Sequence, residues 1–424
     1  MPDDAVPLVE HLFRQQAGRL TARLTRVLGP ANITLAEDAV QEAMMRALRT
    51  WPFEGVPANA AGWLYTVAHH IAIDAVRRDR SFGDKTDAIV AEIARSGTTC
   101  VPDETGVGDQ LRDDELRMIF MCCHPEIPRD SSVALSLKTV GGFSVREIAR
   151  AFLADETAIA QRIVRAKKQI RERCLTLDLP AGRALGERLD AVLDVLYFMF
   201  NEGYTAHQGE ELIRRDLCME AIRLGRLIAG TTLSTPHTHA LVALMALLAA
   251  RFRARVDEEG DLVLFDDQNR ALWDEGLIAL GFRHFDRSMS GDHVSAYHVQ
   301  AAIAATQARA LTPELMDWPL ILELYDQLVA IDPSPVVALN RAVALAKVRG
   351  AGEGLAAVER LGRDPKLRHY HLLMAARGQL LAELGRASEA ARSFEEALGC
   401  AGVSEPERRF LRKRLALQLT RRAE

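Results

Sequence analysis

One stretch of the chain places cationic and amide side chains at the spacing of a helix face. Between residues 155 and 173 these side chains are Gln161, Arg162, Arg165, Lys168 and Arg171. Cationic groups neutralise phosphates, and arginine and glutamine can hydrogen-bond to guanine and adenine edges. The pattern therefore predicts a DNA-binding helix, with a merely solvated basic face as the alternative.

The surrounding residues predict a helix-turn-helix that would position this helix. Ser144 and Glu147 form an S-x-x-E capping box that begins a first helix, and residues 154–156 make the turn. The second helix has one apolar stripe, which would be buried and leave the cationic side chains outside. The stripe consists of Ile159, Ile163, Ala166 and Ile170.

A second pair of helices is predicted near the N-terminus. Thr34 and Glu37 match a capping box and predict a helix that runs to about Trp51. Its polar residues recur on one face, opposite an apolar side. The apolar side consists of Ala36, Val40, Ala43, Ala47 and Leu48. After a loop over 51–62, the pattern predicts a helix over 63–80. Trp63 is expected in the core, with an exposed stacking platform as the alternative.

In this order, the predicted elements resemble regions two and four of an extracytoplasmic-function sigma factor of bacterial RNA polymerase. The residues that carry the resemblance are Glu37-Asp38-Ala39-Val40-Gln41-Glu42, Trp63-Leu64-Tyr65, Ile73-Asp74, Arg77-Arg78 and Arg165-Ala166-Lys167. The resemblance implies a protein that directs core RNA polymerase to specific promoters and starts transcription. The sequence shows no nucleophile-base-orienter set, phosphate-binding glycine loop or acid pair at a defined spacing, so we expect that the chain is not an enzyme.

The resemblance implies three binding surfaces. The polar face of the first helix would bind a coiled coil on the largest subunit of core RNA polymerase through Asp38, Gln41, Glu42 and Arg46. The next loop and helix would capture an extruded base of the minus-ten promoter element. These residues are Phe53, Asn59, His70, Arg77, Arg78 and Arg80. The helix-turn-helix would contact minus-thirty-five promoter DNA through Thr157, Gln161, Arg162, Arg165, Lys167, Lys168 and Arg171.

Two positions depart from the family pattern. His69-His70 stand where an arginine-asparagine pair is usual, and Ala160 stands where a basic residue is frequent. The second departure places the expected minus-thirty-five base contacts on Gln161, Arg162 and Arg165.

The residues after Pro180 show helical periodicity and short loops with glycine and proline. Residues 188–206 and 262–274 resemble the domain that follows region four in a subgroup of these sigma factors with a C-terminus like tetratricopeptide (TPR) repeats. We expect this module to regulate the factor in cis, because no membrane-spanning segment is evident and the fused helical part is large.

The C-terminal part is expected to contain TPR-like repeats. Residues 384–402 look like the second half of a repeat, and 349–364 is an earlier near-copy. The two copies align Gly352 with Gly385, and Leu361 with Phe394, at an offset of 33 residues. Stacked repeats leave a concave surface, for which we expect a protein partner.

Several clusters could suggest a metal site, but each has a structural interpretation. Adjacent helical residues diverge by about 100°, so Cys122-Cys123-His124 would not present both thiols to one ion. His237 and His239 lack a third ligand. Gly203 suits a helix C-cap. Helix N-caps account for the group Asp266, Asp267, Asn269 and Asp274. We expect no metal and no cofactor.

Composition limits the class of protein further. The net charge of −5 provides no global basic field for nucleic acid, so the basic groups must act locally. The six cysteines have no C-x-x-C spacing and are expected to be reduced and mostly buried. No signal peptide is apparent, and the apolar run 241–250 is too short to span a membrane. We expect a cytoplasmic protein without a membrane partner.

The expected fold is all-α. The domains are region two over 5–80, a flexible linker over 81–110, region four over 111–177, a helical module over 183–290 and TPR-like repeats over 291–424. Two alternatives are a helix-turn-helix regulator that does not recruit polymerase and a TPR-type interaction scaffold.

Overall fold

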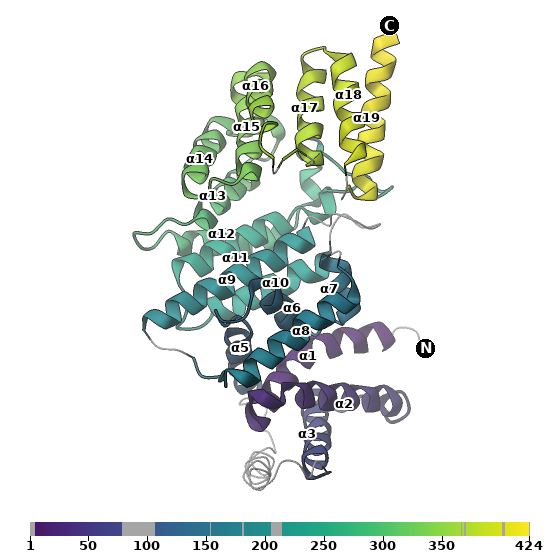
Figure 1. The fold of residues 1–424 in the computed structure, drawn as a ribbon, viewed down its shortest axis with the longest axis vertical. Coiled ribbons are helices and arrows are strands. Elements are labelled where there is room, and N and C mark those ends of the chain that lie inside the picture. Colours follow the sequence, from purple (N-terminus) through teal and green to yellow (C-terminus); the bar gives the residue numbers. More distant parts are fainter. Residues whose placement is uncertain are drawn as a thin grey trace. The chain divides into compact units, whose positions relative to one another are not determined.

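Helices make up all the regular secondary structure of this computed structural model (Figure 1). It describes residues 5–78, 107–152, 154–179, 182–204, 214–365, 367–368, 370–400 and 403–423. Within these ranges the β-structure is an isolated bridge between Val256 and Leu262. The all-α prediction is confirmed. The chain divides into two compact units, Met1–Phe198 and Met199–Glu424.

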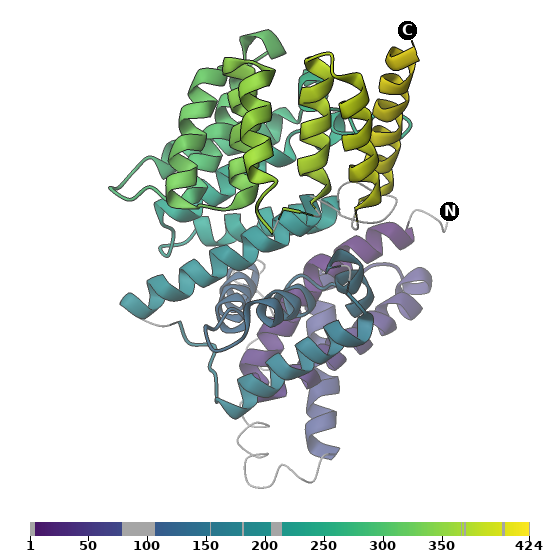
Figure 2. The ribbon, with the colours of Figure 1, turned by 45° about the horizontal axis from the view of Figure 1, so that its top comes forward.

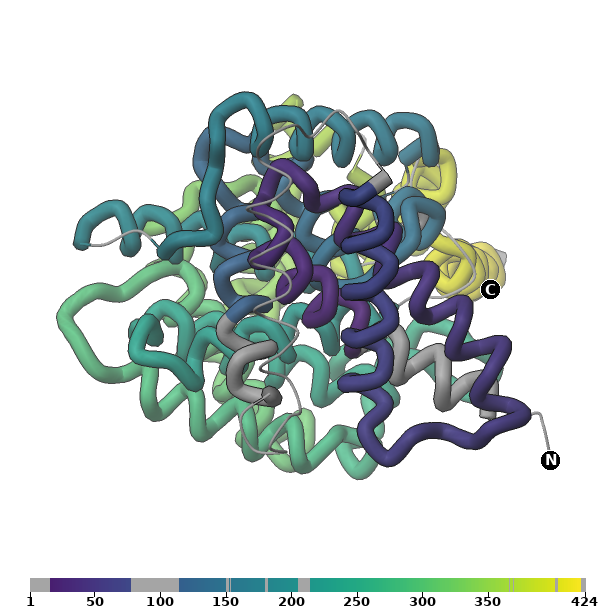
Figure 3. The backbone as a smooth tube through the Cα atoms, turned by 90° about the horizontal axis from the view of Figure 1, so that it is seen from below, coloured from purple at the N-terminus to yellow at the C-terminus, as the bar shows by residue number. Residues whose placement is uncertain are grey.

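The first unit begins with three helices around one apolar core. α1 (Ala5–Leu28) packs against α2 (Ile33–Glu54), which packs against α3 (Ala60–Arg78) (Figure 3). Buried side chains recur three or four residues apart, so each helix buries one stripe. They include Leu20, Leu24, Val40, Ala43, Leu64 and Ala68.

The structure corrects several predicted features of these helices. α2 begins at Ile33, and its N-cap residue Asn32 makes no side-chain cap, so the capping box predicted at Thr34 and Glu37 is wrong. α2 continues through Pro52 to Glu54, and the loop shrinks to residues 55–59. Leu48 was expected in the core but is exposed.

Four further helices form the predicted helix-turn-helix region. They are α5 (Val107–Cys122), α6 (Arg129–Thr139), α7 (Val145–Phe152) and α8 (Glu156–Glu172). The capping box is confirmed, because Ser144 N donates to Glu147 Oε2 and Glu147 N donates to Ser144 Oγ. The predicted stripe of α8 is buried, and α8 packs against α6 and α7.

The structure places the start of α5 inside the segment that was predicted as a linker. Residues 107–110 are helical rather than linker. The remainder of that segment lies outside the described residues. The linker prediction over 81–106 therefore stays a prediction.

α9 (Arg183–Tyr204) contributes to the cores of both units. In the first unit, Arg188 Nη1 donates to the Phe120 carbonyl at 3.1 Å, and the Phe198 ring stacks on Phe152 at 5.7 Å. In the second unit, Cys218 Sγ donates to the Phe200 carbonyl at 3.4 Å. The boundary between the compact units thus lies inside α9.

Gly203 lies inside α9 rather than at a C-cap. A Cβ at this position would be 2.7 Å from Cys218 Sγ and 2.9 Å from the Arg214 carbonyl oxygen. Both distances are shorter than van der Waals contact. Glycine is therefore required because α10 approaches closely.

The second unit continues with four helices, one of which is buried among the other three. They are α10 (Arg215–Ala229), α11 (Pro236–Ala249), α12 (Glu275–Ser288) and α13 (Ala296–Arg309). α11 contacts the other three, which explains why 241–250 is apolar on all sides. Among the described residues, no helix is long and apolar enough to cross a membrane.

Six helices complete the second unit as consecutive hairpins (Figure 2). They are α14 (Trp318–Ile331), α15 (Pro335–Arg349), α16 (Ala351–Leu361), α17 (His371–Glu383), α18 (Ala387–Gly399) and α19 (Glu405–Ala423). Each helix packs against the next, and one apolar core runs through them.

The hairpins are periodic, with a register that differs from the predicted alignment. α16 starts at 351 and α18 at 387, an offset of 36 residues (387 − 351). The matching glycines are Gly350 and Gly385, with φ of 92° and 73° just before these helices. Gly352 lies within α16. The predicted alignment, which paired Gly352 with Gly385 because the two sequences are similar, was therefore two residues out of register at the glycine.

Candidate polymerase and nucleic-acid interfaces

α2 presents the four predicted polymerase-binding side chains on one exposed face. Asp38, Gln41, Glu42 and Arg46 are all exposed, while the opposite side of the helix enters the core. Arg46 Nε donates to Glu42 Oε1 at 3.2 Å. Half-exposed pairs of this kind contribute little to stability, about 0.3–0.5 kcal/mol, so they are free to exchange partners.

The short connection between α2 and α3 exposes apolar groups. Phe53, in the last turn of α2, is 89% exposed, and Val56 is 56% exposed. An aromatic ring held in water at a turn can stack on an unpaired base at a gain of about 1–3 kcal/mol. The position is suitable for the base capture that was predicted for Phe53.

Asn59 holds the start of α3. Its Oδ1 accepts a hydrogen bond from Gly62 N at 2.8 Å, and a Cβ on Gly62 would lie 2.8 Å from Asn59 Nδ2. The amide of Asn59 is exposed beside this cap. Trp63 packs edge-on against Trp51 at 5.5 Å between ring centroids, as its predicted core role requires.

α3 carries the other predicted minus-ten residues. His70 and Arg77 are exposed, whereas His69 is buried. Arg78 ends the helix, but its side chain lies outside the described residues, as does the whole of Arg80. The exposed His70 lies one turn after Thr66 in α3, the helix that follows the short connection after Phe53.

α8 exposes most of the predicted minus-thirty-five set. Asp155 caps the helix through Thr157 N at 2.7 Å. Hydrogen bonding from the Thr157 side chain, and then from its backbone N–H, lowers the pKa of the Asp155 carboxyl group. Arg165 Nη2 donates to Gln161 Oε1 at 3.3 Å. The exposed members are Thr157, Gln161, Arg165, Lys168 and Arg171.

Two members of the predicted set lie apart from this exposed face. Arg162 is half-buried, with its guanidinium 4.0 Å from Asp130. Lys167 Nζ lies 2.6 Å from Glu37 Oε2 of α2, and the two side chains are only 16% and 9% exposed. Lys167 therefore joins the two predicted binding domains inside the first unit.

Sequence reasoning missed a larger set of charges at the same interface. Asp114 and Glu115 of α5 are almost fully buried. Arg23 and Arg26 of α1 bond the Asp114 carboxylate at 3.0 and 2.7 Å, and Arg19 bonds Glu115 at 3.3 Å. The spacing of 19, 23 and 26 places three cations on one face of α1, which is the signal that could have revealed them.

The cysteine and histidine clusters make structural contacts. Burial raises the pKa of the Cys123 thiol to about 12, and its Sγ lies 3.7 Å from Ser136 Oγ. Cys122 contacts Thr139 instead, at 3.4 Å. His124 Nδ1 accepts from Glu126 N. Within the described residues, no group of three or more His, Cys, Asp or Glu is arranged to hold a metal ion.

The acidic residues near 270 divide between caps and an ion pair. Asn269 caps a short 3-10 helix over Arg270–Leu272, and Asp274 caps α12 through Leu277 N at 2.9 Å. Both N-cap predictions are confirmed. Asp266 instead pairs with Lys347 of α15 at 2.7 Å.

His237 and His239 belong to α11 and lie against other histidines. His239 Nδ1 lies 2.9 Å from His284 Nδ1, and the His237 ring packs edge-on against His298. His239 and His298 also bond neighbouring hydroxyl groups. These rings are therefore held by contacts within the fold.

Comparison with family sequences separates the chain into three matched regions. Residues 12–82 match Sigma-70 region 2, and residues 117–170 match Sigma-70 region 4. Residues 188–289 match a family of unknown function, DUF6596. No solved structure matches the chain.

Individual relatives extend this result. An uncharacterized protein of Rhizobium meliloti, R00370, is 42% identical over 390 residues, which are 91% of this chain and 90% of the relative. The ECF RNA polymerase sigma-E factor of Escherichia coli is 30% identical over 136 residues, 31% of this chain and 70% of the relative. The RNA polymerase sigma factor CarQ of Myxococcus xanthus is 27% identical over 182 residues, 43% of this chain and 97% of the relative.

Proposed function

The chain belongs to the extracytoplasmic-function sigma factors of bacterial RNA polymerase, and on that premise we propose which of its surfaces carry out each step of initiation. Sigma domains bind core RNA polymerase and promoter DNA. We assign these contacts to particular residues and give the C-terminal extension a regulatory role.

The exposed face of α2 docks on core polymerase. Asp38, Gln41, Glu42 and Arg46 span more than two turns and offer both charge signs and an amide. Such a face suits a partner helix, because charges at i, i+3 and i+4 can pair across a helix-helix contact. This single exposed face is the observation that carries the proposal.

The decisive experiment replaces the polar side chains of this face without changing the fold. Asp38→Ala, Gln41→Ala and Glu42→Ala together should abolish core binding in a pull-down and run-off transcription, with an unchanged far-UV circular dichroism spectrum. Arg183→Ala with Glu187→Ala, which removes an exposed pair on α9, is the matched control and should transcribe normally. Core affinity that survived the triple change would refute the assigned face.

The minus-ten element is captured between the α2–α3 loop and α3. The exposed Phe53 ring stacks on an extruded base, while Asn59 and His70 border it and Arg77, Arg78 and Arg80 neutralise phosphates. The minus-thirty-five element is contacted by the exposed face of α8. Gln161 and Arg165 contact bases there, and Lys168 and Arg171 contact phosphates. From beside this face, Arg162 also contacts bases, and Lys167 reaches phosphates once it leaves Glu37.

Binding both elements at once requires the two domains to separate. The elements are named for positions about 25 base pairs apart, which is roughly 85 Å of duplex at about 3.4 Å per base pair. α1, with 24 residues, is only about 36 Å long, and α8 touches α2 through Lys167. The arrangement with the Lys167–Glu37 pair is therefore a closed form, which opens when both promoter elements are bound.

The extension regulates the sigma domains in cis. α9 supports this proposal, because this one helix supplies packing residues to the first unit and to the second unit. Truncation after Tyr204, which retains the α9 contacts with region four, should change run-off transcription in either direction. Equal transcript yields from the truncated and full chains, at equal core affinity, would rule out the regulation.

A further inference from the structure

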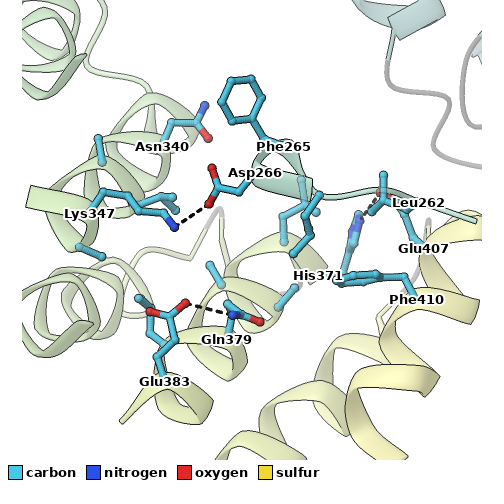
Figure 4. A pocket seen from close by; sticks show the side chains of 18 of the residues that line it. Leu262, Phe265, Asp266, Asn340, Lys347, His371, Gln379, Glu383, Glu407 and Phe410 are labelled. Atoms are coloured by element: carbon cyan, nitrogen blue, oxygen red, sulfur yellow. Dashed lines mark hydrogen bonds and ion pairs between the residues drawn. The ribbon is translucent and has the colours of Figure 1, made fainter. Parts of the chain in front are cut away.

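The second unit contains a pocket of about 460 Å³ on one side of the helical hairpins (Figure 4). α15 and α17 provide small and apolar lining groups, including Val343, Ala346, Leu372 and Ala376. Pockets that take small organic ligands have volumes of about 300–1,000 Å³ and mostly apolar linings with few polar groups. The pocket therefore has the size and lining of a small-molecule site, and it lies far in sequence from the sigma domains.

The segment 261–266 forms a fixed wall of this pocket. Asp261 forms ion pairs with Arg409 and Lys413 of α19, and Asp266 pairs with Lys347 of α15 at 2.7 Å. Leu262, Leu264 and Phe265, which lie between these two anchors, line the pocket. The lining on this side is therefore held at both ends by ion pairs.

Two carboxylates of the lining already have partners within the fold. Asp266 pairs with Lys347, and the Glu407 carboxylate accepts from His371 at 3.3 Å and from Ser404. The Arg251 guanidinium lies 4.3 Å from the centre of the Phe265 ring and donates to Gln268. The carboxylates of Asp266 and Glu407 are therefore not available to a cationic ligand.

Glu383 differs from the other two carboxylates of the lining. Among the described residues its hydrogen-bond partner is the Gln379 amide, at 3.0 Å, and no cationic side chain pairs with it. Figure 4 shows Glu383 and Gln379 on the side of α17 that faces Lys347 and Asn340. The carboxylate therefore favours a ligand with a positive charge, and the neighbouring amides can accept further N–H donors.

The apolar part of the lining is also partly exposed to solvent. Val343 and Leu372 are 37% and 38% exposed although both belong to the pocket. The aromatic rings of Trp318, Tyr325 and Phe410 complete the lining. Covering this surface with an apolar body would remove it from water, which is favourable.

We propose that this pocket binds a small amphipathic organic cation, an amine with an aromatic or short aliphatic body. The amine lies at Glu383, with Gln379 and Asn340 beside it, and the body covers Val343 and Leu372. The proposal concerns binding to the purified chain, so its test does not depend on transcription by the sigma domains.

Isothermal titration calorimetry with three matched probes tests the charge preference. The probes are 3-phenylpropylamine, 3-phenylpropan-1-ol and 3-phenylpropanoate, added to the full chain at pH 7. We expect saturable binding of the amine, about tenfold tighter than that of the carboxylate. Glu383→Gln should bring the affinity of the amine to within about twofold of that of the alcohol, because the ionic contact is lost while the apolar contact stays.

Two substitutions on the same helix locate the site. Val343→Trp fills the pocket and should abolish amine binding, whereas Val348→Trp, equally exposed at 37% but outside the lining, should leave it unchanged. The circular dichroism spectrum of each variant is compared with that of the unsubstituted chain to check that the variant is folded. The proposal is overturned by no saturable amine binding, by binding that survives Val343→Trp, or by a carboxylate that binds as tightly as the amine. It is also overturned if a capped tetrapeptide binds more tightly than the amine does.

Discussion

Lys167 of α8 bonds through Nζ to the Glu37 carboxylate of α2 at 2.6 Å, across 130 residues of sequence. Both side chains are largely buried, and the second carboxylate oxygen of Glu37 has no hydrogen-bond partner among the described residues. Within that part of the chain, Lys167 is the cation that pairs with Glu37. A lysine predicted to contact promoter phosphates thus serves, in the closed form, to hold the two sigma domains together.

Removing Lys167 should destabilise the closed first unit. Lys167→Ala leaves a buried carboxylate unpaired, for which the expected loss is about 3 kcal/mol of unfolding free energy in urea. Lys167→Ala combined with Glu37→Ala should lose less than the sum of the single changes, because no charge is left uncompensated. Strictly additive losses in this double-mutant cycle would show that the pair does not couple the domains.

Asp114 should be more important for stability than any exposed aspartate of the same region. Asp114→Ala leaves Arg23 and Arg26 without their shared partner inside the interface, so we expect a loss of about 3–5 kcal/mol. Asp130→Ala is the control, since Asp130 is 65% exposed and 4.0 Å from Arg162. Its effect should stay within about 0.5 kcal/mol. Similar midpoints of thermal unfolding for the two variants would contradict the interface described here.

Gly203 and Gly186, both in α9, should respond oppositely to alanine. Gly203→Ala forces a Cβ against Cys218 Sγ and should cost about 1–3 kcal/mol. Gly186→Ala meets no atom within 4 Å and should stabilise by up to about 1 kcal/mol, because alanine favours the helix. Urea unfolding of both variants checks this prediction, and a neutral Gly203→Ala would mean that α10 does not approach so closely.

The second unit should lose stability as the pH falls below 6.5. Burial, then the neighbouring His239 and Arg287, lower the pKa of His284 to about 4 from an ordinary 6.5. Between these values the unfolded chain takes up a proton that the folded chain does not. The unfolding free energy should therefore be intact above pH 6.5 and fall by about 3 kcal/mol by pH 4.

Two substitutions isolate the contribution of His284. His284→Leu should reduce the pH dependence of urea unfolding between pH 6.5 and 4, followed by tryptophan fluorescence. His293→Leu, at an exposed histidine, should leave it unchanged. An unaltered slope in the His284 variant would show that this histidine titrates normally in the folded protein.

The helices and their buried faces were largely predictable from the sequence. The apolar stripe of α8 and the Ser144–Glu147 capping box depend on residues within a few turns of each other, and both are confirmed. The capping box at Thr34 was wrong for the same local reason. The S/T-x-x-E pattern also occurs inside helices, and nothing nearby in sequence showed that the helix began at Ile33.

The candidate sites divide in a similar way. Periodicity alone placed Asp38, Gln41 and Glu42 on one exposed face, because a helix with one apolar stripe leaves its other side in water. The same reasoning put Lys167 with the phosphate-binding residues of α8. The periodicity of α8 contains no information about α2, whose Glu37 carboxylate pairs with Lys167.

The sequence by itself determined the all-α class and the exposed faces of α2 and α8, since these follow from spacing within single helices, and its resemblance to a known family indicated the two sigma regions. Only the tertiary structure decided which charges pair over long separations, as in Lys167 with Glu37 and Lys347 with Asp266. It alone also revealed the pocket beside Glu383. The physical reason is that periodicity specifies which side of a helix is buried, whereas the identity of the group opposite depends on how whole helices pack.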